Sequence, residues 1–292
     1  MKGITAEVRA TGVGLASILL WAALAVLTVL ARGLPPFELL TLAFLVAALA
    51  GGALLAVRGR VALAHLSQPW AAWLTAFGGI FFYHALYFIA LTSAPAAQAN
   101  LINYLWPLLI VLLAAATGSG LQARHVIGAL FGLAGTALIL LGPSQATPDR
   151  SHLSGYCAAL GCAVVWASYS VFNRRFRQVP SAMLVGVCAA VALAGGLCHL
   201  ALESTVWPGP GQALAILMIG LGPTGLAFLA WDHATKHGNL PLLGTLSYLT
   251  PLASTLLLIA AGEAAAPGRL MISALLVISG AVLAAGLPWL RR

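Results

Sequence analysis

Residues 104–107 read Tyr-Leu-Trp-Pro, and residues 248–251 read Tyr-Leu-Thr-Pro, at an offset of 144 positions. At an offset of 145, Trp21 and the alanine that follows it meet Trp166 and the alanine that follows it. Similarity of a chain to itself at one nearly constant offset indicates a duplicated unit. The chain is therefore predicted to consist of two related halves.

The composition excludes a soluble globular protein. Of the 292 residues, 61% are hydrophobic and 7% are charged, and the mean hydropathy is +1.00. Soluble domains carry about 25% charged residues. The apolar residues form runs of about 20, which as helices cross roughly 30 Å of hydrocarbon, and the alternation typical of a membrane β-barrel is absent. The sequence predicts an all-α membrane protein.

Ten apolar segments, separated by glycine, proline or charged residues, are predicted to span the membrane. They cover residues 11–32, 36–57, 70–92, 95–116, 122–142, 153–173, 181–201, 211–235, 240–261 and 268–289. The two halves, residues 1–147 and 148–292, then contain five transmembrane helices each. Because five is odd, the second half enters the membrane from the opposite side, which makes the fold an inverted-topology repeat.

The basic residues predict the orientation of the chain. With the N-terminus in the cytoplasm, 11 of the 14 lysines and arginines lie in cytoplasmic segments, and three, Arg32, Arg150 and Arg269, lie outside. The cytoplasmic ones are Lys2, Arg9, Arg58, Arg60, Arg124, Arg174, Arg175, Arg177, Lys236, Arg291 and Arg292. This bias follows the positive-inside rule, so both termini are predicted to be cytoplasmic. Because orientation accounts for the net charge of +8, no nucleic-acid partner is expected.

The motifs favour transport over enzymatic chemistry. The connections are short, and the sequence has no phosphate-binding G-x-x-x-x-G-K-[ST] loop, H-E-x-x-H motif, intramembrane aspartate pair or Gly-x-Ser-x-Gly with a base. No catalytic residue, metal ligand or cofactor is therefore assigned. Inverted repeats are typical of carriers that expose one central site to each side in turn, although duplicated halves also persist because they pack well.

Helix-interrupting residues recur at matching positions of the two halves. Residues 77–79, Phe-Gly-Gly, correspond to the Gly-Leu-Gly-Pro-Thr-Gly run at 220–225, and Pro107 corresponds to Pro251. A proline within a helix frees the carbonyl four residues earlier, and broken helices at membrane depth face protein or a wet cavity. We expect the binding site near these positions, with a new helix N-terminus suited to a carboxylate. A plain packing kink is the alternative for residues 77–79.

Polar and aromatic side chains at membrane depth are candidates to line a cavity. Asn100 and Asn103 share one helical face with Pro107, and rings separated by three or four residues lie on common faces. Such a pocket suits planar or apolar solutes, whereas hydrogen bonding and ring packing between helices are the alternative roles. The candidate substrate-binding residues are Trp21, Tyr83, His84, Tyr87, Asn100, Asn103, Tyr104, Trp166, Tyr169, Trp231, Ser247 and Tyr248.

Ionisable groups near the centres of the spans are few. No span has a carboxylate near its centre, so facilitated transport and ion-coupled antiport are both open. His84 is a hydrogen-bonding group, a substrate contact or a proton carrier. The glycines at 128, 132 and 135 and at 195–196 allow close helix contacts, within the chain or in a dimer. The expected state is a monomer or a homodimer.

These features together resemble the EamA-type branch of the drug/metabolite transporter superfamily. The resemblance is carried by Leu20-Trp21-Ala22 and Val165-Trp166-Ala167, by Tyr87-x-x-Ala90 and Trp231-x-x-Ala234, by the two Tyr-Leu-x-Pro runs, and by Gly262-Glu263 after the ninth span. It implies ten spans in two inverted halves. It also implies a central cavity lined by the first, third, fourth, sixth, eighth and ninth spans.

The Asn-Tyr-Leu-Trp-Pro run at 103–107 and the aromatic-rich third span are similar to those of bacterial aromatic amino acid exporters. This resemblance implies an inner-membrane carrier whose partners are the lipid bilayer and a small-molecule substrate, an aromatic or other hydrophobic amino acid. A broad-range efflux carrier for drugs or metabolites is the alternative. The first half has Ser119 where the second has Glu263, so Glu263 is expected to be a loop or capping residue.

Overall fold

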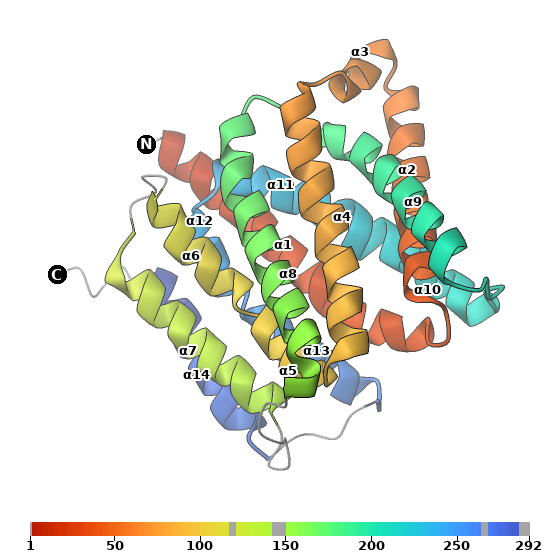
Figure 1. The fold of residues 1–292 in the computed structure, drawn as a ribbon. Coiled ribbons are helices and arrows are strands. Elements are labelled where there is room, and N and C mark those ends of the chain that lie inside the picture. The colour runs from red at the N-terminus through yellow and green to blue at the C-terminus, as the bar shows by residue number, and fades with distance from the viewer. Residues whose placement is uncertain (1, 117–120, 142–149, 264–267, 286–292) are drawn as a thin grey trace.

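The computed structural model describes residues 2–116, 121–141, 150–263 and 268–285, and all regular structure in these ranges is helical (Figure 1). The longer helices are α1 (Lys2–Leu30), α2 (Pro36–Val57), α4 (Trp70–Ser93), α5 (Ala96–Asn103), α6 (Trp106–Ala116), α7 (Ala123–Leu140), α8 (Leu153–Phe172), α9 (Leu184–Leu202), α10 (Pro210–Leu221), α11 (Ala227–His237), α12 (Leu240–Leu246), α13 (Leu249–Ala260) and α14 (Leu270–Ala285). The short ones are α3 (Arg60–Leu63), η1 (Ala64–Leu66), η2 (Arg150–His152), η3 (Asn173–Phe176), η4 (Ser181–Met183) and η5 (Gly222–Leu226).

These helices form the ten expected spans. In the described ranges, nine helical segments are long and apolar enough to cross a membrane, and α14 is a shorter apolar helix. The fourth span combines α5 and α6, the eighth combines α10, η5 and α11, and the ninth combines α12 and α13. The prediction of an all-α membrane protein with ten spans is thus confirmed. Ser119, Arg291, Arg292 and the end of the tenth span lie outside the described residues.

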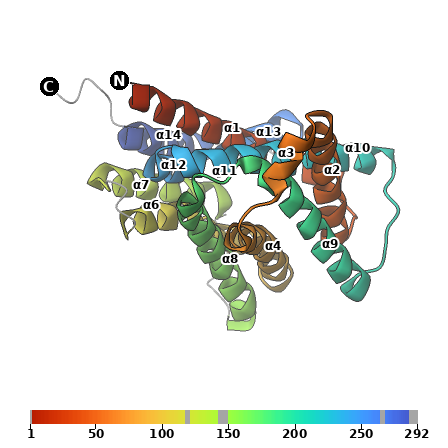
Figure 2. The same ribbon diagram turned by 90° about the horizontal axis from the view of Figure 1, so that it is seen from above.

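The most extensive helix contacts between the two halves have counterparts in which the halves are interchanged. α2 packs on α9 and α7 packs on α14, so the second and fifth spans each lie against their own counterparts (Figures 1 and 2). α8 packs on α4 as α1 packs on α11, so the first span of each half contacts the third span of the other. Ala6 and Glu7 at the start of α1 line one hollow with Arg174 and Arg177, which follow α8. The first spans of the two halves therefore run in opposite directions, as an inverted repeat requires.

Glycines bring the paired helices into close contact. A Cβ atom on Gly128 would lie 2.5 Å from the carbonyl oxygen of Gly280, and one on Gly195 would lie 2.6 Å from Leu40. Gly128 therefore allows α7 to approach α14, and Gly195 allows α9 to approach α2. The glycine faces singled out in the sequence are used inside the chain, which is one of the two uses that the sequence left open.

The two mid-span prolines coincide with helix interruptions. α5 ends at Asn103 and α6 begins at Trp106, whereas α12 ends at Leu246 and α13 begins at Leu249. Each interruption lies just before Pro107 or Pro251, where the ring removes a backbone donor and crowds the preceding turn. The fourth and ninth spans are therefore discontinuous at equivalent depths.

The glycine-rich runs behave differently from the expectation. Residues 77–79 lie within the uninterrupted α4, and residues 222–226 form the π-helical turn η5 inside a continuous eighth span. The π turn accommodates Pro223 without ending the helix, and the Thr224 hydroxyl donates to the carbonyl of Ile219 at 2.9 Å. Neither of these two described segments starts a new helix with free N–H groups. The prediction of a carboxylate-binding helix N-terminus at 220–225 is therefore wrong.

Candidate functional site

A cavity of about 240 Å³ lies between spans of both repeats, toward one end of the helix bundle. Its rim includes Thr28 and Pro36, which are exposed, and its floor includes Phe44 and Trp166, which are buried. The rim is at the end of the spans that carries Arg32, Arg150 and Arg269, opposite the end where most arginines lie. The cavity therefore reaches the face that the positive-inside rule assigns to the outside.

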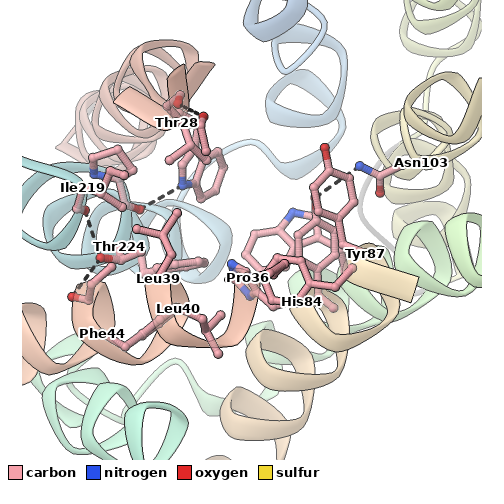
Figure 3. A pocket seen from close by; sticks show the side chains of 18 of the residues that line it. Thr28, Pro36, Leu39, Leu40, Phe44, His84, Tyr87, Asn103, Ile219 and Thr224 are labelled. Carbon is pink, nitrogen blue, oxygen red and sulfur yellow. Dashed lines mark hydrogen bonds between the residues drawn. The ribbon is translucent and has the colours of Figure 1, made fainter. Parts of the chain in front are cut away.

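The two walls of the cavity differ in chemistry. Figure 3 shows Leu39, Leu40 and Phe44 with Ile219 and Thr224 on one side, and His84, Tyr87 and Asn103 on the other. Among the described lining residues there is no Asp, Glu, Lys or Arg. A solute without net charge suits such a wall, because a charged group would lose its hydration without gaining an opposite charge.

Four tryptophans from both halves cluster at the bottom of the cavity, where three of them line it and Trp231 packs behind them. The ring centroid of Trp21 lies 5.6 Å from that of Trp166 and 5.2 Å from that of Trp231. Trp106 lies 5.8 Å from Trp231 at an interplanar angle of 88°. The Trp21–Trp166 and Trp106–Trp231 pairs are edge-to-face, and such pairs contribute about 0.5–1.5 kcal/mol each beyond area burial. The first spans of both repeats therefore meet the fourth and eighth spans through a common aromatic cluster.

Two indoles of this cluster, the partly buried Trp21 and the buried Trp231, have hydrogen-bond acceptors. The Trp21 Nε1–H donates to the carbonyl of Pro223 at 3.1 Å, and the Trp231 Nε1–H donates to the Ser170 hydroxyl at 3.1 Å. The first bond satisfies a carbonyl of the π turn and so connects the eighth span to the first span. Both bonds also fix the ring planes.

Tyrosines and amides supply the polar part of the cavity. The Tyr87 hydroxyl donates to Asn100 Oδ1 at 2.6 Å, and Asn103 Nδ2 donates to the Tyr83 hydroxyl at 3.2 Å. Within the described residues, Asn103 Oδ1 and Thr250 Oγ1 are buried without a partner. An unpaired acceptor and an unpaired hydroxyl beside one cavity are suited to a ligand that has both donors and acceptors.

His84 is held in a single orientation. Its Nδ1 lies 2.7 Å from the carbonyl oxygen of Ile80, and because a carbonyl only accepts, Nδ1 carries the proton. The ring lies edge-to-face with Phe44, at 5.4 Å, and with Tyr83, at 5.3 Å. In the neutral ring, Nε2 is then the nitrogen that accepts hydrogen bonds.

The structure places eight of the twelve candidate residues on this cavity. They are Trp21, Tyr83, His84, Tyr87, Asn100, Asn103, Tyr104 and Trp166. The other four, Tyr169, Trp231, Ser247 and Tyr248, are buried behind the wall. A Cβ atom on Gly79 would lie 2.5 Å from Tyr169, and one on Gly132 would lie 2.4 Å from Tyr248, so glycines of neighbouring helices receive both rings.

The second span also lines the cavity, although the sequence did not single it out. α2 contributes Pro36, Leu39, Leu40, Ala43 and Phe44 to the lining, and this span was absent from the expected set. Its lining residues are apolar, so they do not stand out in a helix that is apolar on all sides. The signal that was present is Phe44, a ring at the same depth as the other aromatics.

A family model described as the EamA-like transporter family matches residues 10–141 and again residues 153–286. An aromatic amino acid exporter of Ancylobacter novellus, YddG, is 46% identical over 279 residues, which is 94% of this chain and 96% of that protein. YddG of Salmonella typhimurium, also an aromatic amino acid exporter, is 30% identical over 182 residues, or 58% of this chain and 59% of that protein.

The fold is also found in a solved structure. A crystal structure with 44% sequence identity superimposes with a TM-score of 0.91, covering 95% of this chain and 96% of that chain. The similarity therefore extends over both halves, including the helices that form the cavity.

Proposed function

Since the chain belongs to the EamA-like transporter family, we propose that it exports aromatic and other hydrophobic amino acids by alternating access around the cavity. The similarity to the Ancylobacter novellus exporter over nearly its whole length supports this substrate class. The observation that carries the proposal is a cavity with aromatic walls whose lining includes Asn103 and Thr250, two residues with a buried, unpaired side-chain oxygen among the described residues.

The chemistry of the cavity fits an amino acid in two parts. Rings such as Tyr83 and Trp166 offer faces and edges for an aromatic side chain. Asn103 Oδ1 accepts from the ammonium group, and the Thr250 hydroxyl donates to the carboxylate. The zwitterion has no net charge, which agrees with a lining that has no Asp, Glu, Lys or Arg among its described residues.

The orientation proposed for the chain gives the direction of transport a structural basis. The protein is a multi-pass membrane protein, and we place it in a bacterial inner membrane with both termini in the cytoplasm. The cavity then faces outward, in the state from which substrate is released. Residues 1–147 and 148–292 act as the two repeats whose exchange of conformations opens the cytoplasmic side.

Transport is proposed as the whole activity, without catalysis or a cofactor. The chain lies in the bilayer as a monomer or a homodimer. Its substrate is a free amino acid, and no nucleic-acid partner is proposed. Whether the movement is facilitated or coupled to protons decides the response to a pH gradient, so transport measured with and without that gradient separates the two.

Counterflow in proteoliposomes tests the substrate class. Vesicles loaded with unlabelled phenylalanine should accumulate labelled phenylalanine or tryptophan well above empty vesicles, and glycine or lysine should not replace them as the internal substrate. In vesicles without internal substrate, net uptake of labelled phenylalanine that a pH gradient drives indicates proton coupling, whereas net uptake that the gradient leaves unchanged indicates facilitated transport. Vesicles with folded protein that accumulate none of these amino acids contradict the proposal, and competition by unrelated organic cations would point to broad-range efflux.

A matched pair of variants links the activity to the cavity. Trp166→Phe changes a ring on the cavity floor, whereas Trp70→Phe changes a ring that is 75% exposed on the outside of α4. We expect the first to lower the rate of counterflow several-fold and the second to leave it unchanged. Equal rates of counterflow in both variants would contradict the role of the cavity in transport.

A further inference from the structure

A cluster of polar side chains is buried near the end of the eighth span. Asn173 Nδ2 donates to Asp232 Oδ1 at 2.9 Å and contacts the Thr235 hydroxyl at 3.1 Å. Lys236 Nζ donates to Asp232 Oδ2 at 2.8 Å and to the carbonyl of Val179 at 3.0 Å. The four polar side chains are all at most 3% exposed. Hydrogen bonds therefore join α11 to the end of α8 and to the loop before α9.

Burying an ion pair is costly for a helix bundle. Desolvation of two charges opposes their mutual attraction, so a buried pair stabilises a fold less than well-packed apolar residues often do. In membrane proteins, such groups usually belong to a transport path or a moving contact. The position of the cluster shows which of these applies.

The cluster lies between two hollows. Along α8 and the turn that follows it, Trp166 lines the outer cavity, Asn173 is buried, and Arg174 and Arg177 line a second hollow. Trp166 and Arg174 are eight residues apart, or about 12 Å along a helix.

The other two helices follow the same order. On α11, Asp232 separates Phe228, on the cavity, from His233, on the second hollow. On α1, the buried Ile18 separates Trp21 from Ala10. A plug of about two helical turns therefore closes the path between the two hollows.

The repeat relates this plug to the open side of the molecule. At the offsets of 145 and 144 found in the sequence, Asn173 corresponds to Thr28 and Asp232 corresponds to Phe88. Thr28 and Phe88 both line the open outer cavity, whereas Asn173 and Asp232 are hydrogen-bonded to each other. The equivalent helix ends therefore line an open cavity in the first half and are hydrogen-bonded to each other in the second.

We propose that Asn173, Asp232, Thr235 and Lys236 form the cytoplasmic gate of this transporter, and that the Asn173–Asp232 and Lys236–Val179 contacts break when the path opens inward. This inference rests on the alternating access of the proposed function. If the halves exchange conformations, the second half takes the open arrangement of the first, and Asn173 and Asp232 separate to line an inward cavity as Thr28 and Phe88 line the outer one. At the same time, Thr28 and Phe88 close the outer side with no charged contact.

The ion pair gives this gate a specific property. When the gate opens, water reaches Asp232 and Lys236, and their hydration compensates for the contacts that are lost. The hydrogen bonds from Asn173 favour the closed gate, whereas hydration of the charges favours the open one. Because these two contributions oppose each other, the closed state is not so stable that the gate cannot open.

Distance measurements between spin labels test the gate without any substrate. The four cysteines are first replaced, and labels are placed at the exposed residues Gln178 and His233 for the cytoplasmic side. A second labelled variant carries its labels at Arg32 and Thr92 for the outer side. Double electron–electron resonance then reports whether each side is open or closed.

Two substitutions weaken the closed gate to different degrees. Asn173→Val removes the amide that bridges to Asp232, and we expect about a tenfold rise in the ratio of inward-open to outward-open molecules. Thr235→Val keeps the side-chain shape and removes the hydroxyl that accepts from Asn173 and donates to the carbonyl of Trp231 within its own helix, so we expect about a twofold to threefold rise. In both variants the 178–233 distance should lengthen as the 32–92 distance shortens.

Thr245→Val is the matched control. Thr245 is also buried and hydrogen-bonds the carbonyl of His125 at 3.3 Å, but it joins α12 to α7, away from the plug. Its distance distributions should match those of the parent protein. Unchanged distributions in folded Asn173→Val and Thr235→Val overturn the gate, as does an equal change in the control.

Different experimental results would contradict the gate and the substrate class. Variants that shift the distances in a protein that moves no aromatic amino acid would contradict the proposed substrate and leave the gate standing. Variants that leave the distances unchanged in a protein that exports phenylalanine would contradict the gate alone.

Discussion

The side-chain amide of Asn103 donates to the Tyr83 hydroxyl at 3.2 Å, while the other end of the same amide, Oδ1, has no partner among the described residues. The tyrosine fixes the amide of this cavity-lining residue in one orientation, and its oxygen stays buried without a partner. A buried unpaired acceptor destabilises the empty state, and a ligand that donates to it relieves this cost.

Replacing this amide should therefore weaken substrate binding. For Asn103→Leu, which keeps a similar volume, we expect at least about a tenfold loss of kcat/KM for phenylalanine, because hydrogen bonds to charged groups contribute about 1.5–3 kcal/mol. Initial rates in proteoliposomes over a range of concentrations measure it. Thr136→Val, which removes another buried unpaired oxygen in α7, should have wild-type kinetics. Equal losses in both variants would assign the effect to folding.

The bond from Trp21 to the π turn should contribute to stability. Trp21→Phe removes ring volume and the Nε1–H that donates to the carbonyl of Pro223, so that a carbonyl of the π turn loses its partner. Trp166→Phe removes a similar ring volume from the same cluster. We expect Trp21→Phe to lower the free energy of unfolding by about 1 kcal/mol more than Trp166→Phe. Thermal unfolding in one detergent compares the two, and equal melting temperatures would contradict the role of this bond.

Gly132 is expected to be intolerant of a side chain. A Cβ atom there would lie 2.4 Å from Tyr248, in a contact between α7 and the ninth span. Gly132→Ala should therefore destabilise the protein by about 1–3 kcal/mol through overpacking. Gly12→Ala in α1, where a Cβ atom would meet nothing within 4 Å, is the control and should be neutral or slightly stabilising. A stable Gly132→Ala protein would show that Tyr248 moves freely.

A carboxylate caps the second span at the rim of the cavity. Glu203 accepts hydrogen bonds from the backbone N–H groups of Phe37, at 2.9 Å, and Glu38, at 3.1 Å. Glu203→Gln leaves one acceptor oxygen for two donors, so we expect faster hydrogen exchange at these two amides and a loss of about 1 kcal/mol. Glu263→Gln, at an exposed carboxylate, should change neither. Unchanged exchange at Phe37 and Glu38 would contradict the cap.

Periodicity and proline positions were sufficient for the architecture. Runs of about 20 apolar residues define the spans, and Pro107 and Pro251 mark the interruptions of the fourth and ninth spans, because a proline's effect on its own helix is local. The glycine-rich run at 220–225 differs from the prediction for a partly non-local reason. Trp21 and Thr224 satisfy the carbonyls around Pro223, and the helix continues through a π turn.

The candidate site could be predicted only in part, because an apolar sequence does not reveal which face of each helix points toward the cavity. Trp166 faces the cavity, whereas Tyr169, one turn later on the same helix, packs against Gly79 of α4. Water distinguishes the faces of a soluble helix, but lipid and protein interior are both apolar, so hydrophobicity does not distinguish the faces of a membrane helix. The contribution of α2 was missed for the same reason.

The clustering of tryptophans at the cavity floor has an optical consequence. Trp21, Trp106, Trp166 and Trp231 are half of the eight indoles in the chain, and their neighbouring centroids lie 5.2–6.4 Å apart. Indoles this close exchange excitation energy, so that the ultraviolet emission of the whole protein is weighted toward this one place. A solute stacking on these rings, or water entering as the helices separate, changes the wavelength and the intensity of this emission. The unlabelled protein thus contains its own fluorescent indicator of occupancy.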